Sequence, residues 1–217
     1  MPGTDAAEGP ITRVNIGRLT NTIFVFTLFL LFRYIKTPTF EDWMANATAE
    51  EFGALQMPEI FSFVNAFLIV AMVWVIAFHV FHQYVKLDRL YLYLHFTLLM
   101  FVIFIPITNQ HALFFYTNPV ATELFHLNML AIGIVIALEW LHGIRNPDLL
   151  EPAVMGNWLL PTHVSVLFFP LTAIAGILMV QIGIPFTQYI YFIPLVSLAL
   201  SSTSLEGYFH KAGRRGS

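Results

Sequence analysis

Two long apolar segments joined by a short charged turn constrain this chain more than any other feature. The first apolar run extends from Ser62 to Tyr84 and the second from Leu90 to Ile105, and neither contains Lys, Arg, Asp or Glu. The turn between them is Lys86-Leu87-Asp88-Arg89. A helix needs about 20 residues to cross a hydrocarbon core about 30 Å thick. The pattern therefore predicts two transmembrane helices and an integral membrane protein.

The remaining apolar runs extend this prediction to six transmembrane helices. Runs this long and uniformly apolar do not fit barrel strands, and in lipid only helices and closed barrels satisfy the backbone. Prolines fall near several of the expected ends, and the third helix is expected to stop at Pro106. The predicted class is all-α, with helices at about residues 17–37, 58–84, 90–107, 120–144, 158–183 and 186–206.

The distribution of Lys and Arg predicts the orientation. With the N-terminus inside, eight basic residues lie on the inner side, whereas the outer side holds Lys36 and, just within helix one, Arg33. This bias places both termini in the cytoplasm. The expected parts are an N-terminal segment 1–16, a transmembrane domain 17–206 and a basic tail 207–217.

Composition excludes several classes of function. Hydrophobic residues make up 58% of the chain and charged residues 11%, and there is no cysteine. Thiolate metal sites and disulfides are therefore absent, and a net charge of −3 argues against a nucleic-acid partner. No Ser-His-acid arrangement has recognisable spacing, so we predict no enzyme and no cofactor.

Polar residues inside the apolar runs are the candidates for function, because burying them in lipid is costly. Histidines on different helices raise the alternative of a haem protein, although a buried histidine is more often one that is simply hydrogen-bonded. Glu139 is either a proton or cation site or, as we favour, a residue that reaches the headgroups or pairs with Arg145 or His142. The candidates are Asn21, Arg33, His79, His82, His95, Glu139 and His163.

The first helix carries an apolar face with polar residues at both ends. Residues spaced by three or four share a helix face, and this face consists of Thr22, Phe26, Leu30 or Phe29, and Arg33. In a symmetric assembly it would form stacked apolar rings, and apolar constrictions gate by excluding water. The alternative is a core helix packed within its own subunit. Asn21 and Thr22 would need partners on other helices, which His79, His82 or His95 could supply.

Helices one to three resemble the transmembrane protein 175 family of endolysosomal potassium channels and their prokaryotic six-helix homologues. The residues that carry the resemblance are Phe61-Ser62-Phe63, Trp74, Lys86-Leu87-Asp88-Arg89, Pro106 and the helix-one exit Ile35-Lys36-Thr37-Pro38. The resemblance implies six helices per subunit, a homotetramer with helix one around the axis, and potassium permeation.

The family signature Arg-x-x-x-Phe-Ser-Asp is altered here. Its Phe-Ser-Asp slot holds Leu19-Thr20-Asn21, and its Arg falls at Asn15. Either Arg18 takes over the role of that Arg, or the role is lost. The residues implied to tie the helices together are Arg18, Thr20, Asn21, His79, His82 and His95. The implied pore and gate residues are Phe26, Phe29, Leu30 and Arg33, and Thr22 lies on the same helix face. Arg33 would either bring positive charge into the pore or, as we favour, extend to the headgroups or pair with Glu41, Asp42, Glu59 or Glu123.

The leading hypothesis is potassium-like cation permeation through a tetrameric pore with an apolar gate. The partners would be further copies of the chain, the lipid bilayer and monovalent ions, in a prokaryotic plasma membrane. One alternative is a non-conducting scaffold or partner subunit, and another is a haem-binding redox protein. Because histidine titrates between pH 5 and 8, gating by pH through His79, His82 and His95 is a further expectation.

Overall fold

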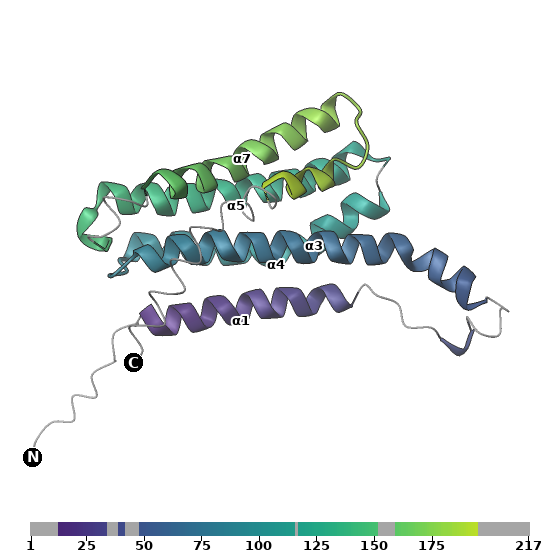
Figure 1. Cartoon of the computed structure of the whole chain (residues 1–217), viewed down its shortest axis with the longest axis horizontal. Helices are drawn as coiled ribbons and strands as arrows, with labels where there is room; N and C mark the ends of the chain where they lie inside the picture. Colours follow the sequence, from purple (N-terminus) through teal and green to yellow (C-terminus); the bar gives the residue numbers. More distant parts are fainter. Residues whose placement is uncertain (1–12, 34–38, 42–47, 116, 152–158, 195–217) are drawn as a thin grey trace, which may run out of the picture.

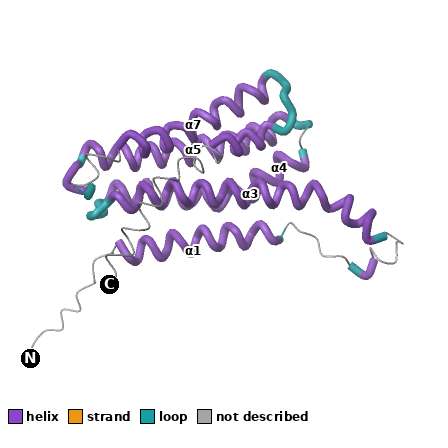
Figure 2. The backbone as a smooth tube through the Cα atoms, in the orientation of Figure 1, coloured by secondary structure: helices purple, strands orange, loops and turns teal. Residues whose placement is uncertain are grey.

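In the computed structural model the chain is a bundle of long helices that run roughly side by side (Figure 1). The structure describes residues 13–33, 39–41, 48–115, 117–151 and 159–194. Within these ranges the backbone is helical or loop, with one isolated bridge between Tyr84 and Leu150 and no strand (Figure 2). The predicted all-α class is thus confirmed. The long helices are α1 (Arg13–Phe32), α3 (Ala49–Gln83), α4 (Arg89–Phe114), α5 (Pro119–Arg145) and α7 (Leu159–Gln181).

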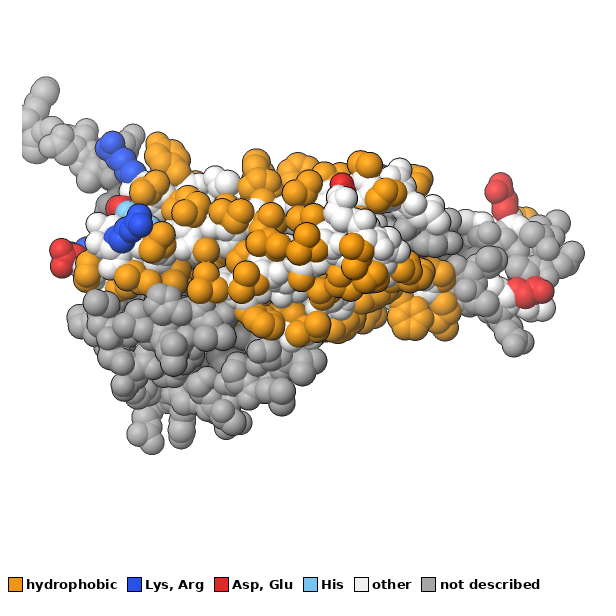
Figure 3. All heavy atoms as spheres, turned by 90° about the horizontal axis from the view of Figure 1, so that it is seen from above, with side chains coloured by type: hydrophobic (Ala, Val, Ile, Leu, Met, Phe, Trp, Pro, Cys, Tyr) orange, Lys and Arg blue, Asp and Glu red, His pale blue; other side chains and the backbone are white. Residues whose placement is uncertain are grey.

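Four of these helices are long and apolar enough to cross a membrane. They are α1, the segment Met57–Gln83 of α3, α4 and α5. A shorter apolar helix, Val166–Gln181, forms the larger part of α7. On the face seen from above, hydrophobic side chains cover the middle, and Lys and Arg gather at one end (Figure 3). This distribution is what a protein with a membrane-embedded middle requires.

Side-chain caps determine where the helices begin. Asp88 caps α4, where its carboxylate accepts the backbone N–H of Tyr91 at 2.9 Å, so the charged turn predicted between helices two and three ends in a helix start. Asn118 caps α5 in the same way, and Pro119 occupies the first position of that helix. Thr48 and Glu51 form a capping box at the start of α3.

Two of the predicted helix boundaries are wrong because proline does not end the helices. Pro58 lies inside α3, which begins at Ala49, and Pro106 lies inside α4, which continues to Phe114. Proline removes one helical hydrogen bond, but neighbouring helices hold the chain in place. Beyond Pro106, the buried side chain of Asn109 bonds to Ser62 and accepts a bond from Asn65 on α3. These contacts between α3 and α4 offset the helical hydrogen bond that Pro106 removes.

Other boundaries also shift. Helix α1 begins at Arg13 rather than residue 17, so the predicted N-terminal segment 1–16 is partly helical. The helix ends at Phe32 rather than residue 37. The sixth predicted helix, 186–206, opens as the 3₁₀ helix η2 (Thr187–Tyr191), after Phe186 in the left-handed conformation with φ 58°. Residues 195–206 of that helix, and the tail 207–217, lie outside the described residues.

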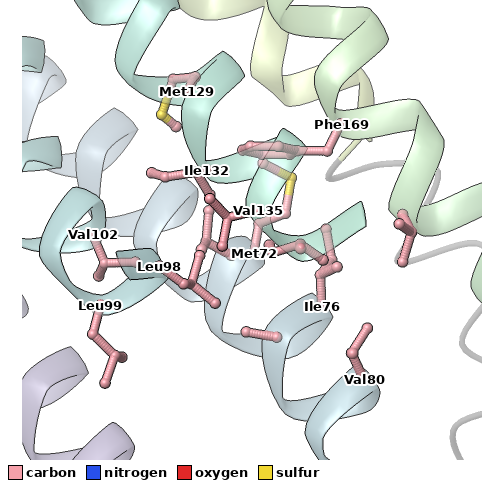
Figure 4. Packing of buried hydrophobic residues seen from close by; sticks show 14 of the residues in the cluster. Met72, Ile76, Val80, Leu98, Leu99, Val102, Met129, Ile132, Val135 and Phe169 are labelled. Carbon is pink, nitrogen blue, oxygen red and sulfur yellow. The ribbon is translucent and has the colours of Figure 1, made fainter. Parts of the chain in front are cut away.

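The core lies where α3, α4, α5 and α7 meet (Figure 4). Helices α5 and α7 approach so closely that a Cβ added at Gly133 would lie 2.9 Å from the backbone nitrogen of Pro170. Glycine at that position therefore permits the crossing. Helix α1 lies at the edge of the bundle and packs against α3 and α4. The core residues labelled in Figure 4 are Met72, Ile76, Val80, Leu98, Leu99, Val102, Met129, Ile132, Val135 and Phe169.

Candidate functional site

One face of α1 is packed against the bundle and the opposite face is exposed. The packed face is formed by five buried residues at intervals of three or four: Ile16, Thr20, Phe24, Thr27 and Leu31. Only 28% of the span is buried, the smallest share among the four candidate spans. A helix buried on one side alone leaves the other side for lipid or for another protein surface.

The residues predicted to line a pore lie on the exposed face of α1. Phe26 is 49% exposed and Phe29 is 69% exposed, and Thr22 and Arg33 are exposed as well. Leu30 is half-buried and lies at the edge of this face. The pore face, meaning Thr22, Phe26, Phe29 and Arg33, therefore makes little contact with its own subunit.

Arg33 has no side-chain bond or ion pair within the described part of the chain. It follows the last turn of α1, where its backbone N–H donates to the carbonyl of Leu30 at 3.3 Å. The predicted pairing of Arg33 with Glu123 is not found, because Glu123 accepts a hydrogen bond from Gln181 instead. Asp42, another predicted partner, lies outside the described residues.

On its packed face, α1 is held by a buried chain of hydrogen bonds. The Thr20 hydroxyl lies 2.8 Å from Nε2 of His95 on α4, and both residues are almost fully buried. His95 Nδ1 lies 3.0 Å from Oε1 of Glu139 on α5. The structure thus brings together two of the predicted residues, Thr20 and His95. These hydrogen bonds link α1, α4 and α5 through buried side chains.

Glu139 is a predicted candidate, but the sequence does not predict its partner in these hydrogen bonds. It is 0% exposed, and it pairs with His95 rather than with Arg145 or His142. His142 pairs instead with Asp88, at 2.8 Å. Glu139 precedes Trp140 near the end of its helix, and that position is compatible with reaching the headgroups. The signal that marks it is its spacing of seven from Ile132 and four from Val135, both core residues of α5.

The other predicted polar residues take different roles. Asn21 accepts a hydrogen bond from the indole of Trp74 on α3 at 3.1 Å, so its partner is not a histidine. The backbone carbonyl of His82 accepts a hydrogen bond from the Arg13 guanidinium at 3.1 Å. Arg18 is exposed and its carbonyl accepts from Thr22 within α1, so its side chain does not join the buried chain. His79 is half-buried on α3.

Two of the described histidines, His95 and His126, have no ring nitrogen free for a haem iron. In His95 and in His126 both ring nitrogens lie within hydrogen-bond distance of protein groups; for His126 these are Tyr191 and Thr187. A haem ligand needs a free ring nitrogen directed at the iron. Among the described residues no group of three or more His, Cys, Asp or Glu is placed to hold a metal ion. His163 lies in a stretch whose side chains are not described.

Replacing Thr20 by valine is expected to destabilise the protein by about 1–3 kcal/mol, because His95 loses a buried hydrogen-bond partner. The thermal midpoint in detergent should fall accordingly. Thr22→Val is the matched control, since the Thr22 hydroxyl is exposed and bonds only to the carbonyl of Arg18 at 2.9 Å. Equal midpoints for the two variants would show that the contact between Thr20 and His95 does not stabilise the fold.

One family model and one solved structure are similar to this chain. The family model described as "Endosomal/lysosomal potassium channel TMEM175" matches residues 15–106. No curated protein matches the chain. Among solved structures, the chain is similar to the crystal structure of a lysosomal potassium-selective channel TMEM175 homolog from Chamaesiphon minutus. The TM-score is 0.72 at 21% identity, over 88% of this chain and 97% of the other.

The family description is that of a channel and not of an enzyme, which agrees with the prediction that the chain is not an enzyme. The matched segment 15–106 comprises α1, α3 and most of α4, the part from which the resemblance is drawn. Together, the match over this segment and the shared fold confirm the resemblance of this chain to the TMEM175 family.

Proposed function

We propose that the chain is an ion channel that passes potassium through a central pore, with α1 of each subunit around the axis of a homotetramer. The observation that carries the proposal is the exposed pore face of α1 on a helix that is only 28% buried. A potassium-selective homologue shares the fold, which supports the same activity here.

The chemistry of the pore face favours a pore lining over a purely lipid-facing surface. Its middle is apolar, with Phe26 and Phe29, whereas Thr22 and Arg33 are polar and lie toward its two ends. Polar groups are rare on lipid-facing surfaces and typical of water-filled paths. An apolar zone between polar mouths fits a pore that closes by excluding water.

Within this pore, Phe26 is our candidate for the principal gate. It is exposed to nearly half of its area and lies one helical turn from Thr22. Leu30, the second gate residue expected from the family resemblance, is half-buried, and Phe29 presents more of its surface. We therefore assign the constriction to Phe26 and Phe29, with Leu30 behind them.

The buried chain from Thr20 through His95 to Glu139 would position the pore helix. Together with the bond between Asn21 and Trp74, it ties the packed face of α1 to three other helices. This polar network would take the place of the family's Phe-Ser-Asp contacts, with the uncharged Asn21 at the position of the signature Asp. We expect both termini in the cytoplasm of a prokaryotic cell, since basic residues gather at the end of the bundle where α1 begins.

Thiol labelling tests whether the exposed face lines the ion path. The chain contains no cysteine, so a single introduced thiol is the sole target. A charged thiol reagent should block the ion flux of Thr22→Cys channels in proteoliposomes. Thr97→Cys on α4 is the matched control, because Thr97 is also exposed and also bonds to the carbonyl four residues earlier. Equal block of both variants, or of neither, would count against α1 as the pore lining.

One observation favours a second candidate, a non-conducting scaffold of the same fold. The pore face carries two bulky phenylalanines, and rings of four at each level would fill a narrow lumen. Stable tetramers that pass no ion under any condition would support this candidate.

A further inference from the structure

The pair formed by His95 and Glu139 is an unusual arrangement for the interior of a membrane protein. His95 is 1% exposed and Glu139 is 0% exposed. One carboxyl oxygen lies 3.0 Å from His95 Nδ1, and the other, Oε2, is buried with no hydrogen-bond partner among the described residues. Burying an ionised carboxylate is costly unless its lone pairs are satisfied. The question is where the protons of this pair are located.

Thr20 fixes the protonation of one side of the histidine. Its hydroxyl oxygen lies 2.8 Å from the carbonyl oxygen of Ile16 and 2.8 Å from His95 Nε2. A hydroxyl has one proton to donate, and a carbonyl oxygen only accepts. When the Thr20 proton goes to Ile16, Nε2 must carry a proton and donate it to Thr20.

The proton on Nε2 determines what Nδ1 requires. In a neutral imidazole with a proton on Nε2, Nδ1 has a lone pair and no proton. This lone pair faces Oε1 of Glu139 at 3.0 Å, a distance that requires a proton between the two atoms. Moving that proton onto the histidine would leave a carboxylate whose Oε2 has no donor. A protonated, neutral Glu139 supplies the proton between Oε1 and Nδ1 and avoids a buried carboxylate whose Oε2 has no donor.

We propose that Glu139 binds one proton as a neutral carboxylic acid whose O–H donates to His95 Nδ1, which makes the junction of α1, α4 and α5 a buried proton-binding site. The ligand is the proton itself. The site joins the pore helix to the bundle through Thr20, so its occupancy acts on α1.

Among the described residues, no lysine or arginine contacts the carboxyl group of Glu139. From α4, the Tyr91 hydroxyl lies 3.3 Å from His95 Nδ1, and the Tyr84 hydroxyl at the end of α3 donates to the backbone carbonyl of Glu139. The Arg13 guanidinium lies 5.6 Å from the ring centre of Phe81, which packs against His95. The remaining titratable groups nearby are His79, His82, Asp88 and His142, and the described side chains of α7, 166–181, include none.

Loss of the proton would reverse the direction of the hydrogen bonds from Glu139 through His95 to Thr20. The proton of the Glu139 carboxyl group moves from Oε1 to His95 Nδ1, where it donates to the new carboxylate, and the Nε2 proton leaves to water. Nε2 then has a lone pair and accepts the Thr20 proton, which leaves the carbonyl of Ile16. One proton is released in total, and the change reaches the backbone of α1 at Ile16.

Infrared spectroscopy of the purified full-length protein tests the site directly. Exposed carboxyl groups are ionised at pH 7, so a protonated carboxyl band at that pH must come from a buried group. We expect the band in the wild type and in Glu123→Gln, and its absence in Glu139→Gln. Glu123 is the matched control, because it also lies on α5 but is only half-buried.

The wild type alone decides the matter if Glu139→Gln does not fold. A band that is present at pH 7, exchanges slowly with deuterium and disappears at higher pH supports the site. A folded wild type without such a band at pH 7 overturns the proposal.

The action of the site on α1 rests on the proposed channel function and has a separate readout. The amide of Glu139→Gln donates an N–H to His95 Nδ1 at every pH and mimics the proton-loaded site. Its flux should stay constant over the pH range in which wild-type flux changes. An unaltered pH response in this variant would refute the action on α1, whereas a wild type without flux would refute the channel and leave the infrared result unaffected.

Discussion

Replacing Phe26 by alanine is expected to raise basal ion flux into proteoliposomes on the order of tenfold, the change that a barrier lower by about 1.4 kcal/mol produces. Phe26 is 49% exposed on a helix with little contact to the rest of its subunit on that side. In a homotetramer one substitution removes four rings from the same level of the pore. A wider constriction holds water more readily, and ions follow the water.

The control for this prediction is Phe104→Ala. Phe104 lies on α4 and is 45% exposed, so it matches Phe26 in size and exposure but not in its expected place at the axis. Its replacement should leave flux unchanged. Equal effects of the two substitutions, or no effect of Phe26→Ala at all, would remove Phe26 from the gate.

Replacing Arg33 by alanine is expected to raise the ratio of cation to anion permeability on the order of tenfold, equivalent to about 1.4 kcal/mol. Arg33 is exposed at the end of the pore face, and its side chain has no ion-pair partner among the described residues. Four guanidinium groups around one mouth would repel cations and attract anions. Reversal potentials under potassium chloride gradients measure the ratio.

Arg33→Lys is the matched variant, because it keeps the positive charge at the same position. Its permeability ratio should stay close to that of the wild type. If Arg33→Ala leaves the ratio unchanged, the Arg33 side chain extends to the headgroups, as long basic side chains near helix ends often do.

The parts of this protein that follow from the sequence are those determined by local patterns. Apolar runs too long for strands predict the helices, and Asp88 marks the start of α4 as an N-cap. Helix spacing predicts that Thr22, Phe26 and Phe29 share a face, and the structure places all three on the exposed side of α1. These features need no knowledge of how the helices pack.

The predictions that fail are those that depend on how the helices pack against one another. Whether Glu139 reaches the headgroups or the core depends on the rotation of α5 against α4, which no single-helix pattern fixes. Likewise, Pro106 predicts a helix end from local chemistry, but α4 continues because Asn109 is held by α3. The partner of Asn21 is Trp74 rather than a histidine because of how α1 sits on α3. The pore itself requires further copies of the chain.

The most direct test of a conducting pore is ion flux into proteoliposomes that contain the purified wild-type protein, with gradients of potassium, sodium and chloride applied separately. The proposed function predicts flux that is larger for potassium than for sodium or chloride. Flux dominated by chloride, or tetramers that pass none of the three ions, would contradict it.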